Sequence, residues 1–326
     1  MKDVRIGIIG CGGMGTHLAR SCLQVHNAKI VGTYDAVKEK AKFLAHQLKC
    51  DYYDSVEDLL DKPDIDAVIV ATPNYTHSAF TIAALKAGKH VFCEKPMALK
   101  LEDCDAMIGA SEKQGLTLMV GHVMRFYHGC AFIKRALENG EIGQPIISHV
   151  FRTTWVKVGA WSKSWRCKKE LCGNSLFEVA IHDIDLMRWF IGDVKSVKAY
   201  SSNFSHPEFD YDDSIIAILR FKNGALGLLE SGFSSRLGDH KIDVNGTLGA
   251  ANIDFKALTV KVAVEGRGER KEPLIKSNPV VDELQHFVNC VSTGKKPITD
   301  GLAGRGAVEI ALAISRACEE AAQMNG

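Results

Sequence analysis

The sequence predicts an α/β protein, with a doubly wound parallel sheet first and then an α+β part built on a large, mostly antiparallel open sheet. Up to about residue 120, short apolar runs alternate with helical patterns, which favours a parallel sheet because its strands need long, right-handed crossovers. From about residue 125, strand patterns follow one another with few helices between them. A chain of 326 residues is long for one core, so we expect two domains, 1–122 and 123–326, with the C-terminal helices able to pack back on the first.

The N-terminal part begins with an apolar, β-branched run that leads into a glycine-rich turn. Short runs of this kind are typical of strands buried on both faces of a parallel sheet. The expected order is strand 4–9, helix 13–25, strand 29–34, strand 66–71, helix 77–87, strand 90–93, helix 101–114 and strand 117–121.

The C-terminal part starts with a helical pattern over 126–139 and ends with two more over 281–293 and 302–321. Between them we expect a sheet covered by a helix at 176–190. At 221–224 the Asn-Gly pair predicts a hairpin, because it supplies the positive φ angles of a tight turn. The expected strands are 146–155, 195–203, 214–221, 225–231, 241–245, 250–255 and 258–264.

The composition is that of an ordinary globular protein, with 46% hydrophobic residues and a formal net charge of +1. This balance gives no electrostatic reason to expect nucleic acid or a membrane as a partner. The N-terminus runs straight into a strand without a signal-peptide core, so we expect a cytoplasmic protein. The ten cysteines contain no Cys-x-x-Cys pair, which favours reduced, structural thiols and no metal site.

The glycine-rich turn carries the spacing Gly10-x-Gly12-x-x-Gly15, with Gly13 and Met14 inside it. A lone match is weak evidence, but here an apolar strand precedes it and a helical pattern follows. Such a turn brings backbone N–H groups at a helix start close to a pyrophosphate. The alternative is a glycine turn without a ligand.

Asp35 follows Gly15 by 20 residues, at the end of the second strand. A carboxylate there accepts hydrogen bonds from ribose hydroxyls and repels a 2′-phosphate, so we expect NAD rather than NADP.

Polar and turn-forming residues follow the next strand of the sheet, at Ala71, Thr72, Pro73 and Asn74. In an open α/β sheet, ligands bind outside the carboxyl ends of the strands, which favours a cofactor-binding role. The alternative is a turn in which Thr76 caps the following helix.

Glu94-Lys95-Pro96 comes directly after the apolar run 90–93. A lysine at the carboxyl end of a strand can hold a cofactor or take part in proton transfer, and Pro96 stiffens the turn. The alternative is a strand-to-helix turn with a solvated ion pair.

Glu178 and His182 are four residues apart in a predicted helix, so they project from one face, with Asp185 close to it. The rest of that face is apolar, and His182 is a natural general base near neutral pH. Ser175-x-x-Glu178 also fits a capping box, and a histidine beside an aspartate is often a satisfied core residue.

The segment before this helix contains Trp155, Trp161, Trp165 and Arg166. Aromatic faces with polar neighbours suit a sugar-like ligand. They equally suit a long loop that is anchored on the sheet.

Taken together, these motifs resemble the glucose–fructose oxidoreductase, inositol dehydrogenase and MocA-like (Gfo/Idh/MocA) family, over nearly the whole chain. The stretch from Glu178 to Asp185 and the residues around 121–145 look most like inositol dehydrogenases. The motifs that fall in family order are Gly-Cys-Gly-Gly-Met-Gly at 10–15, Ala-Thr-Pro-Asn followed by His77, Glu94-Lys95-Pro96, Gly121-His122 with Arg125-Phe126, Gly140-Glu141-Ile142-Gly143, and His182 with Asp185.

The resemblance implies an N-terminal Rossmann domain that binds NAD(P) and a second α/β domain whose open sheet commonly builds the oligomer, here expected to be a homodimer or homotetramer. It implies an NAD-dependent oxidoreductase acting on a secondary alcohol of a cyclitol or sugar, similar to myo-inositol 2-dehydrogenases. Two alternatives remain, an NAD-dependent glycosidase with transient redox chemistry and a non-catalytic NAD-binding regulatory protein.

By the same resemblance, Lys95 lies near the nicotinamide and the reacting hydroxyl, and His182 acts as acid and base. His77 and Glu94 join the cofactor-binding residues. The substrate-binding candidates are Lys95, Arg152, Trp165, Glu178 and His182. Position 178 is usually aspartate in inositol and sugar members, and Cys172-Gly173-Asn174 replaces a glycine-rich stretch, so the substrate is the open question.

Overall fold

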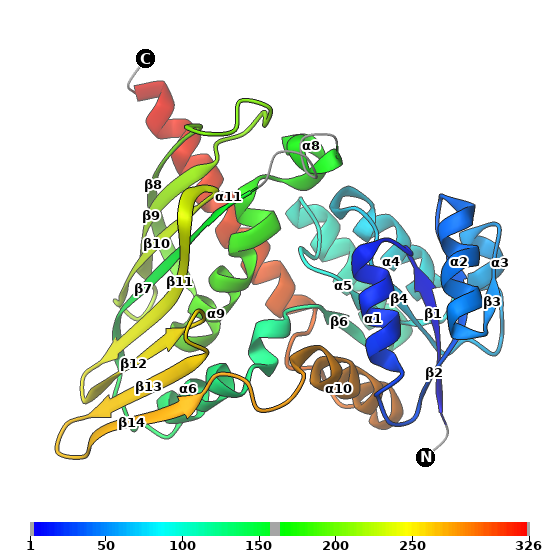
Figure 1. Ribbon diagram of the computed structural model, residues 1–326, viewed down its shortest axis with the longest axis horizontal. Helices are drawn as coiled ribbons and strands as arrows, with labels where there is room; N and C mark the ends of the chain where they lie inside the picture. Colours follow the sequence, from blue (N-terminus) through cyan, green and yellow to red (C-terminus); the bar gives the residue numbers. More distant parts are fainter. Residues whose placement is uncertain (1–2, 157–163, 325–326) are drawn as a thin grey trace. The chain divides into compact units, whose positions relative to one another are not determined.

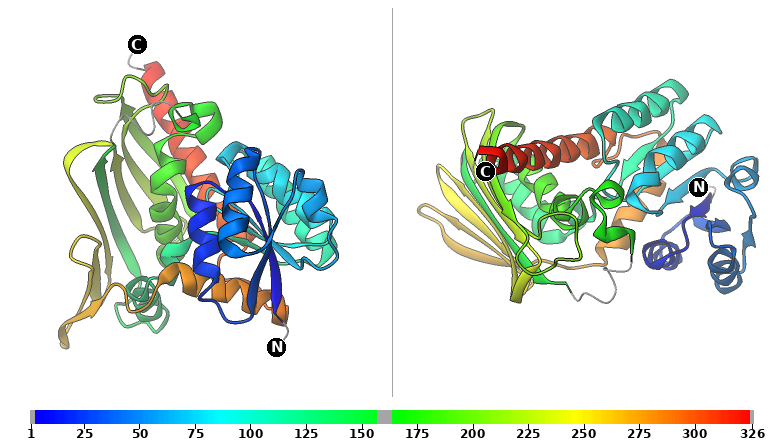
Figure 2. Two further views of the ribbon diagram at one scale, coloured as in Figure 1. Left: turned by 45° about the vertical axis from the view of Figure 1, so that its right-hand side comes forward. Right: turned by 90° about the horizontal axis from the view of Figure 1, so that it is seen from above.

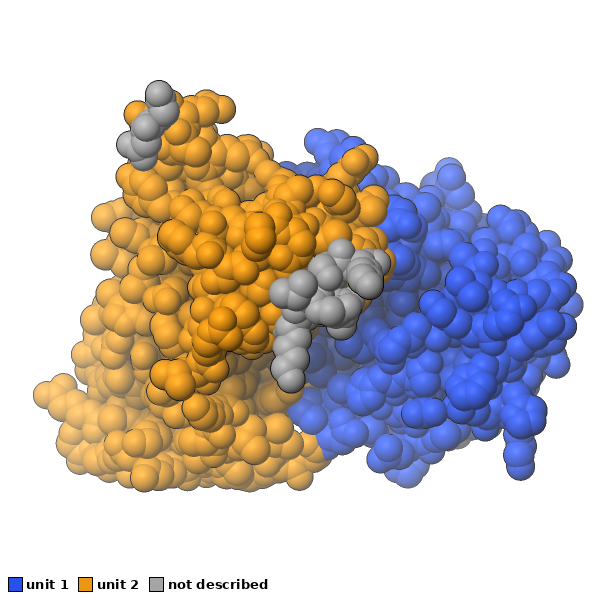
Figure 3. All heavy atoms as spheres, turned by 45° about the horizontal axis from the view of Figure 1, so that its top comes forward, with its two compact units in different colours: residues 1–123, 278–305 blue, residues 124–277, 306–326 orange. Residues whose placement is uncertain are grey.

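The computed structural model describes residues 3–156 and 164–324. The chain forms two compact units, drawn in two colours in Figure 3. The first contains Met1–Val123 and Asn278–Arg305, and the second contains Met124–Ser277 and Gly306–Gly326. The domain boundary expected at residue 122 remains a prediction; the packing places 278–305 with the first unit.

The first unit is built on a six-stranded parallel sheet with the order β3-β2-β1-β4-β5-β6 (Figure 1). The expected doubly wound parallel sheet is confirmed, and its order reverses between β1 and β4, where such sheets bind ligands. The central strands are fully buried because elements pack on both faces. The strands are β1 (Val4–Ile9), β2 (Ala28–Tyr34), β3 (Asp51–Tyr52), β4 (Ala67–Val70), β5 (His90–Cys93) and β6 (Leu118–Val120).

Helices of the first unit connect these strands, and α10 (Pro279–Thr293) joins them from the C-terminal part of the chain. Phe287 of α10 packs edge-on against Phe92 of β5, with ring centroids 5.8 Å apart, and Gln285 accepts a hydrogen bond from the backbone N–H of His26. The other helices are α1 (Gly13–Cys22), α2 (Lys38–Leu48), α3 (Val56–Leu60), η1 (Asn74–Thr76), α4 (His77–Lys86), α5 (Leu101–Gln114) and η2 (Val123–Phe126).

The second unit is built on an eight-stranded sheet with the order β14-β13-β12-β11-β7-β10-β9-β8. All neighbouring strands are antiparallel except the parallel pair β7 and β10, so the expected mostly antiparallel sheet is confirmed. The strands are β7 (Pro145–Trp155), β8 (Val194–Ser202), β9 (Ser214–Phe221), β10 (Leu226–Gly232), β11 (Ser234–Gly246), β12 (Gly249–Asp254), β13 (Thr259–Val264) and β14 (Gly268–Pro273).

One face of this sheet carries the helices of the second unit, as Figure 2 shows. They are α6 (His128–Glu138), η3 (Trp165–Cys167), α8 (Lys169–Cys172), η4 (Leu176–Ala180), α9 (Ile181–Ile191) and the larger part of α11 (Gly301–Met324). In β9 the side chains alternate, with Ala217 and Leu219 buried and Ile216 and Ile218 exposed. The opposite face of the sheet is therefore rich in exposed apolar side chains.

Two local expectations are confirmed, each with a difference in the backbone. The helix expected at 176–190 begins with a π-helical turn, η4, and becomes an α-helix only from Ile181. The hairpin at 221–224 forms, but only Gly224 has a positive φ, of +93°, while the Asn223 side chain bonds the N–H of Ala225 and the carbonyl of Ile191. Among the described residues, no helix is both long and apolar enough to cross a membrane.

Candidate active site

The turn between β1 and α1 needs glycine at two positions for steric reasons. Gly10 has φ +97°, and a Cβ on it would lie 2.6 Å from the carbonyl oxygen of Ala71. A Cβ on Gly15 would lie 1.8 Å from the carbonyl oxygen of Gly10. Because neither residue has a side chain, the end of β1 can lie close to the end of β4 and to α1.

Gly12 and Gly13 lie in the same turn but face open space. Apart from the neighbouring residues of the chain and the backbone of α1 itself, no heavy atom of the described residues lies within 4 Å of a Cβ built on either glycine. Gly12 is the N-cap of α1 and supplies no side-chain cap, so the first backbone N–H groups of the helix are available to an anion. Met14, half exposed, starts the same helix. This open cradle of N–H groups fits the pyrophosphate of a dinucleotide.

Asp35 ties this turn to the end of β2. Its Oδ2 accepts a hydrogen bond from the N–H of Cys11 at 2.7 Å, and its Oδ1 accepts one from the N–H of Val37 at 2.8 Å. Burial, together with the Asp35 charge, raises the pKa of the Cys11 thiol to about 12, so this thiol stays neutral beside the site. The carboxylate is therefore fixed at the position predicted to meet the ribose.

His77 connects the turns that follow β4 and β5. Its ring is buried, with Nδ1 2.7 Å from the carbonyl oxygen of Pro96 and Nε2 2.9 Å from that of Thr72. Thr76 does not cap α4 as expected, because its hydroxyl donates to the Pro73 carbonyl at 2.7 Å and lies 2.8 Å from the Thr72 hydroxyl. Asn74, in η1 between these residues, is buried as well.

Glu94-Lys95-Pro96 follows β5 directly, and the Lys95–Pro96 peptide bond is cis. Glu94 is buried rather than solvated, and its Oε2 accepts the N–H of Lys95 at 3.1 Å. Its carboxyl group lies against Gly121 beyond β6, where a Cβ would come within 3.2 Å of it. Burial raises the pKa of Glu94 to about 7, only partly opposed by Lys95. Lys95 itself is half-buried.

In the second unit, Glu178 lies in the π-helical turn η4 and is buried. Its Oε2 accepts a hydrogen bond from Nε of Arg166 at 2.9 Å, and the guanidinium of Arg166 lies over the ring of Trp165, 4.3 Å from its centroid. The capping box is wrong: Ser175 makes no side-chain cap, and Asn174 instead accepts the N–H of Leu176 through Oδ1 at 3.0 Å. Glu178 is thus paired with an arginine.

Two further carboxylates of this segment are buried and held by arginines. Asp185 receives Nε and Nη2 of Arg125 at 2.7 and 2.6 Å, a bidentate pair with both side chains buried. Asp183 receives Nη1 of Arg152 at 2.9 Å and lies 2.6 Å from Nε2 of His240. Arg152, a predicted substrate-binding residue, therefore contacts the helix through its own guanidinium.

His182 lies in the first turn of α9, between these anchored carboxylates, and is half-buried. Three arginines from separate elements fix the backbone on either side of it, at residues 178, 183 and 185. A π-helical turn directly before an α-helix is often found at functional sites. The segment can therefore hold an imidazole in a defined position beside buried charges, which is what a general base requires.

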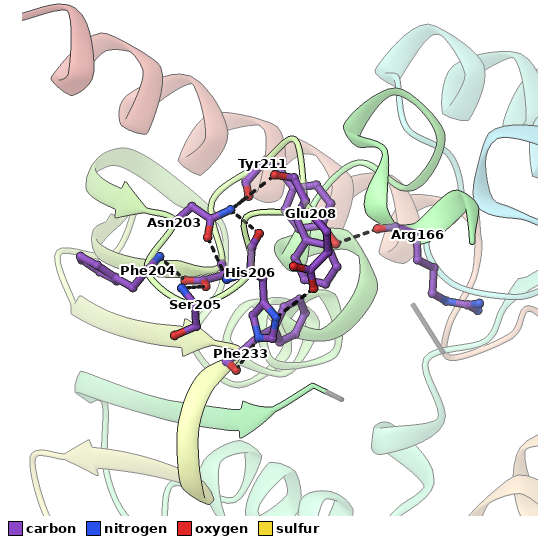
Figure 4. A network of polar contacts seen from close by, with 10 residues as sticks. Arg166, Asn203, Phe204, Ser205, His206, Glu208, Tyr211 and Phe233 are labelled. Carbon is purple, nitrogen blue, oxygen red and sulfur yellow. Dashed lines mark hydrogen bonds and ion pairs between the residues drawn. The ribbon is translucent and has the colours of Figure 1, made fainter. Parts of the chain in front are cut away.

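The loop between β8 and β9 contacts the backbone of Arg166 through Tyr211 (Figure 4). The Asn203 amide donates to the carbonyls of His206, Phe209 and Tyr211 at 2.7, 3.4 and 3.2 Å, which closes the loop on itself. The Tyr211 hydroxyl then donates to the carbonyl of Arg166 at 2.7 Å. Burial raises the pKa of Tyr211 well above its usual value, so the hydroxyl remains a donor.

Sequence reasoning missed Arg125 and His240 as members of this cluster. Arg125 had a signal, because it belongs to the Arg125-Phe126 pair noted above. His240 had none, because only the pairing of β11 with β7 brings it to Asp183. Of the tryptophans, Trp155 packs between Arg236, 3.9 Å from its ring centroid, and the ring of His206 at 5.1 Å, whereas Trp161 lies outside the described residues.

The predicted site residues divide between the two units. Within the first unit, the structure joins Gly10 and Gly15 to Ala71, and His77 to Thr72 and the turn after Lys95. Within the second unit, it brings together the partners of the segment from Glu178 to Asp185.

Comparison with known proteins agrees with this geometry. Residues 4–122 match the family model described as an oxidoreductase family with an NAD-binding Rossmann fold, and residues 131–252 match that of the GFO/IDH/MocA C-terminal domain. The chain belongs to the GFO/IDH/MocA oxidoreductase family. The predictions of family and NAD cofactor are thereby confirmed.

Several curated relatives and solved structures are similar to this chain. The 2,7-anhydro-N-acetylneuraminate hydratase of Escherichia coli K12 is 35% identical over 268 residues, 81% of this chain and 71% of the relative. The myo-inositol 2-dehydrogenase of Thermotoga maritima is 31% identical over 330 residues, 97% of either chain. The aldose-aldose oxidoreductase of Caulobacter crescentus, solved with glycerol, superposes with a TM-score of 0.90 at 28% identity and 98% coverage of both chains.

Proposed function

We propose that this protein is an NAD-dependent dehydrogenase that transfers hydride between a secondary alcohol of a cyclitol or sugar and the nicotinamide, as a myo-inositol 2-dehydrogenase does. The observation that carries the proposal is the segment from Glu178 to Asp185, in which arginine-held carboxylates flank the half-buried His182. The similarity to a myo-inositol 2-dehydrogenase over 97% of both chains supports the same reading.

Bound NAD supplies the hydride acceptor for such an oxidation. The N–H groups at the start of α1 bind its phosphates, and Asp35 accepts hydrogen bonds from its ribose. The turns that contain Thr72, Asn74 and Glu94 complete the cofactor side. Because Asp35 is a fixed carboxylate, it favours NAD over NADP.

In the proposed reaction, a ring nitrogen of His182 accepts the proton of the reacting hydroxyl. The ammonium group of Lys95 donates a hydrogen bond to the same oxygen and stabilises the negative charge that develops on it. Glu178, whose carboxylate is oriented by Arg166, accepts a hydrogen bond from a neighbouring hydroxyl of the ring. Trp165 and Arg152 line the substrate side.

A second candidate is a reaction without net redox change, in which NADH returns the hydride that it received and His182 returns the proton that it accepted. The hydratase of Escherichia coli, 35% identical to this chain, favours it. In this candidate the first step is again the oxidation of a ring alcohol of the substrate by NAD, so the same residues take part. Net formation of NADH separates the two.

We further propose that the protein is a cytoplasmic homodimer or homotetramer. All ten cysteines carry thiols, nine of them buried, which suits a reducing compartment. The uncovered face of the second sheet exposes apolar residues, among them Phe151, Ile216, Ile218 and Leu228, which suits contact with a second copy. Light scattering of the purified protein tests the oligomer; a monomer at micromolar concentration would contradict it.

The activity test is a panel of inositols, aldoses and 2,7-anhydro-N-acetylneuraminate with NAD, followed by absorbance of NADH and by product analysis. We expect NADH to form with a cyclitol or sugar, and Lys95→Ala and His182→Ala to lower kcat by roughly 10²–10⁴-fold. Lys100→Ala, at an exposed position of the first unit, and Arg135→Ala, at an exposed position of α6 in the second unit, are matched controls.

Full activity in Lys95→Ala and His182→Ala would refute the assigned roles. Product without net NADH would favour the second candidate. Tight NADH binding without turnover of any compound would favour a non-catalytic NAD-binding protein.

A further inference from the structure

Asp183, the residue after His182, is the most completely enclosed carboxylate of the α9 segment. Its side chain is fully buried, yet each oxygen has a partner from a different strand. Arg152 of β7 donates from Nη1 to Oδ2 at 2.9 Å, and Nε2 of His240 on β11 lies 2.6 Å from Oδ1. Burial alone would raise the pKa of Asp183, but the charges of Arg152 and His240 outweigh it and hold the pKa below its usual range.

The two partners stand side by side on the sheet, because Arg152 and His240 are directly paired residues of β7 and β11. The His240 ring is also fixed from its face: it stacks on Phe255, with centroids 3.7 Å apart and ring planes within 6°. Phe255 in turn packs edge-on against Tyr127 at 6.2 Å. His240 therefore presents Nε2 to Asp183 in one orientation.

Arg152 already provides a positive charge for Asp183, so His240 is not needed to balance the charge of the carboxylate. What the second partner adds is geometry. A carboxylate bound at one oxygen can still rotate and tilt, whereas partners at both oxygens on adjacent strands fix its plane. Since Asp183 and His182 are neighbours in the first turn of α9, fixing one fixes the backbone that carries the other.

We propose that His240 is a positioning residue for His182, acting through the hydrogen bond between its Nε2 and Asp183. The proposal rests on the proposed function, in which His182 accepts the substrate proton. A base displaced by even a fraction of an ångström transfers protons less well, so the effect belongs in kcat rather than in substrate binding.

Two substitutions separate the hydrogen bond from the ring. His240→Phe keeps a ring to stack on Phe255 but removes the donor. His240→Gln keeps an N–H donor at similar reach but removes the ring. His46→Phe, at an exposed position of α2 in the first unit, is the matched control. The readouts are kcat and KM for the most active substrate, and the His182 ring signals in ¹H–¹³C NMR, assigned with His182→Ala.

We expect His240→Phe to lower kcat on the order of 10- to 100-fold with KM within about 3-fold of the parent value, and to shift the His182 signals. His240→Gln retains kcat within about 3-fold, as does the control. If His240→Phe does not fold, His240→Met, which fills the space without a donor, takes its place.

Three outcomes overturn the proposal. If His240→Phe retains kcat and His240→Gln loses it, the role of His240 is packing. A raised KM with unchanged kcat in both variants makes it a substrate contact. Unmoved His182 signals in His240→Phe exclude positioning. If the parent protein turns over no compound, the proposed function fails by itself, and the NMR comparison still decides the role of His240.

Discussion

Replacing Asp35 by asparagine tests how the first unit selects its cofactor. Each carboxylate oxygen of Asp35 accepts one backbone N–H, from Cys11 at 2.7 Å and from Val37 at 2.8 Å. Asparagine has the same shape but only one acceptor oxygen. Its NH₂ group must therefore face one of the two N–H donors, whichever way the amide turns.

The magnitude follows from these contacts. A hydrogen bond to a charged group contributes about 1.5–3 kcal/mol, and because Asp35 is half-buried we take the lower end. Loosening the glycine turn by about 1.4 kcal/mol corresponds to roughly a tenfold weaker affinity for NADH. The substitution also removes a negative charge that repels a 2′-phosphate, so the affinity for NADPH falls less or rises. We expect the ratio of NADPH to NADH affinity to increase about tenfold or more.

The assay is a fluorescence titration of both cofactors at fixed ionic strength, repeated at high salt. High salt should compress the difference between NADH and NADPH in the parent protein, because the repulsion by Asp35 is electrostatic. Asp51→Asn, at an exposed position of β3, is the control and should leave both affinities unchanged. An unchanged NADPH to NADH ratio in Asp35→Asn would refute the selection by charge, even if both affinities fell.

Three more predictions concern stability. Glu94 has its pKa raised by burial from 4.5 to about 7, so its protonated form stabilises the fold below pH 4.5, and this contribution is lost as pH rises through 7. Between pH 5 and pH 8, the free energy of unfolding of the cofactor-free protein, measured in urea, should fall by a value on the order of 3 kcal/mol. In Glu94→Gln this fall should be absent. A free energy of unfolding that depends on pH in the same way in both proteins would contradict the prediction. Arg125→Met leaves the buried Asp185 without its bidentate partner and should lower the free energy of unfolding by about 3–5 kcal/mol. The control Lys222→Met breaks an exposed ion pair and should lower it by less than about 1 kcal/mol. Equal losses in the two variants would refute the prediction. Tyr211→Phe removes a buried hydroxyl but keeps its stacked ring, and it should cost about 1 kcal/mol and lower Tm by about 2–4 °C. The control Tyr52→Phe, at an exposed position of β3, should have no effect. An unchanged Tm in Tyr211→Phe would show that its hydrogen bond contributes nothing.

Most of the fold could be predicted because its strands carry strong local patterns. Fully apolar runs such as 67–70 and 91–93 have only one good environment, the centre of a parallel sheet. The elements that were missed are short or polar. β3 has two residues, α3 has five, and the edge strand β14 is made largely of charged residues, which keep an open sheet edge from pairing with another chain.

The candidate site was predictable only where its chemistry is local in sequence. The glycine turn, Asp35 and the turn at Lys95 each follow a strand that can be recognised in a few residues. The partners of the α9 segment come from η2, η3, β7 and β11, and no local pattern connects these elements. The π-helical turn at η4 was missed for a related reason: its sequence also suits an α-helix, and the buried pairing of Glu178 with Arg166 is a tertiary contact.

Because the motifs that are local in sequence are those of the cofactor side, we expect substrate specificity to depend on residues of the second unit. Residues that bind a dinucleotide must satisfy the same phosphates and ribose throughout the family, so their spacing is recognisable. In the proposed function, the ring of the substrate is bound instead by side chains whose orientation depends on their partners. Glu178 is one methylene longer than the aspartate that the family resemblance leads us to expect at this position. Nε of Arg166 donates to its carboxylate at 2.9 Å, and the Tyr211 hydroxyl donates to the backbone carbonyl of Arg166. Shortening Glu178 to aspartate would draw the carboxylate away from Arg166 by about 1.5 Å, beyond hydrogen-bond distance. The length of residue 178 and the position of Arg166 therefore belong together, and changing either one alone should alter which hydroxyl is recognised rather than whether the cofactor binds.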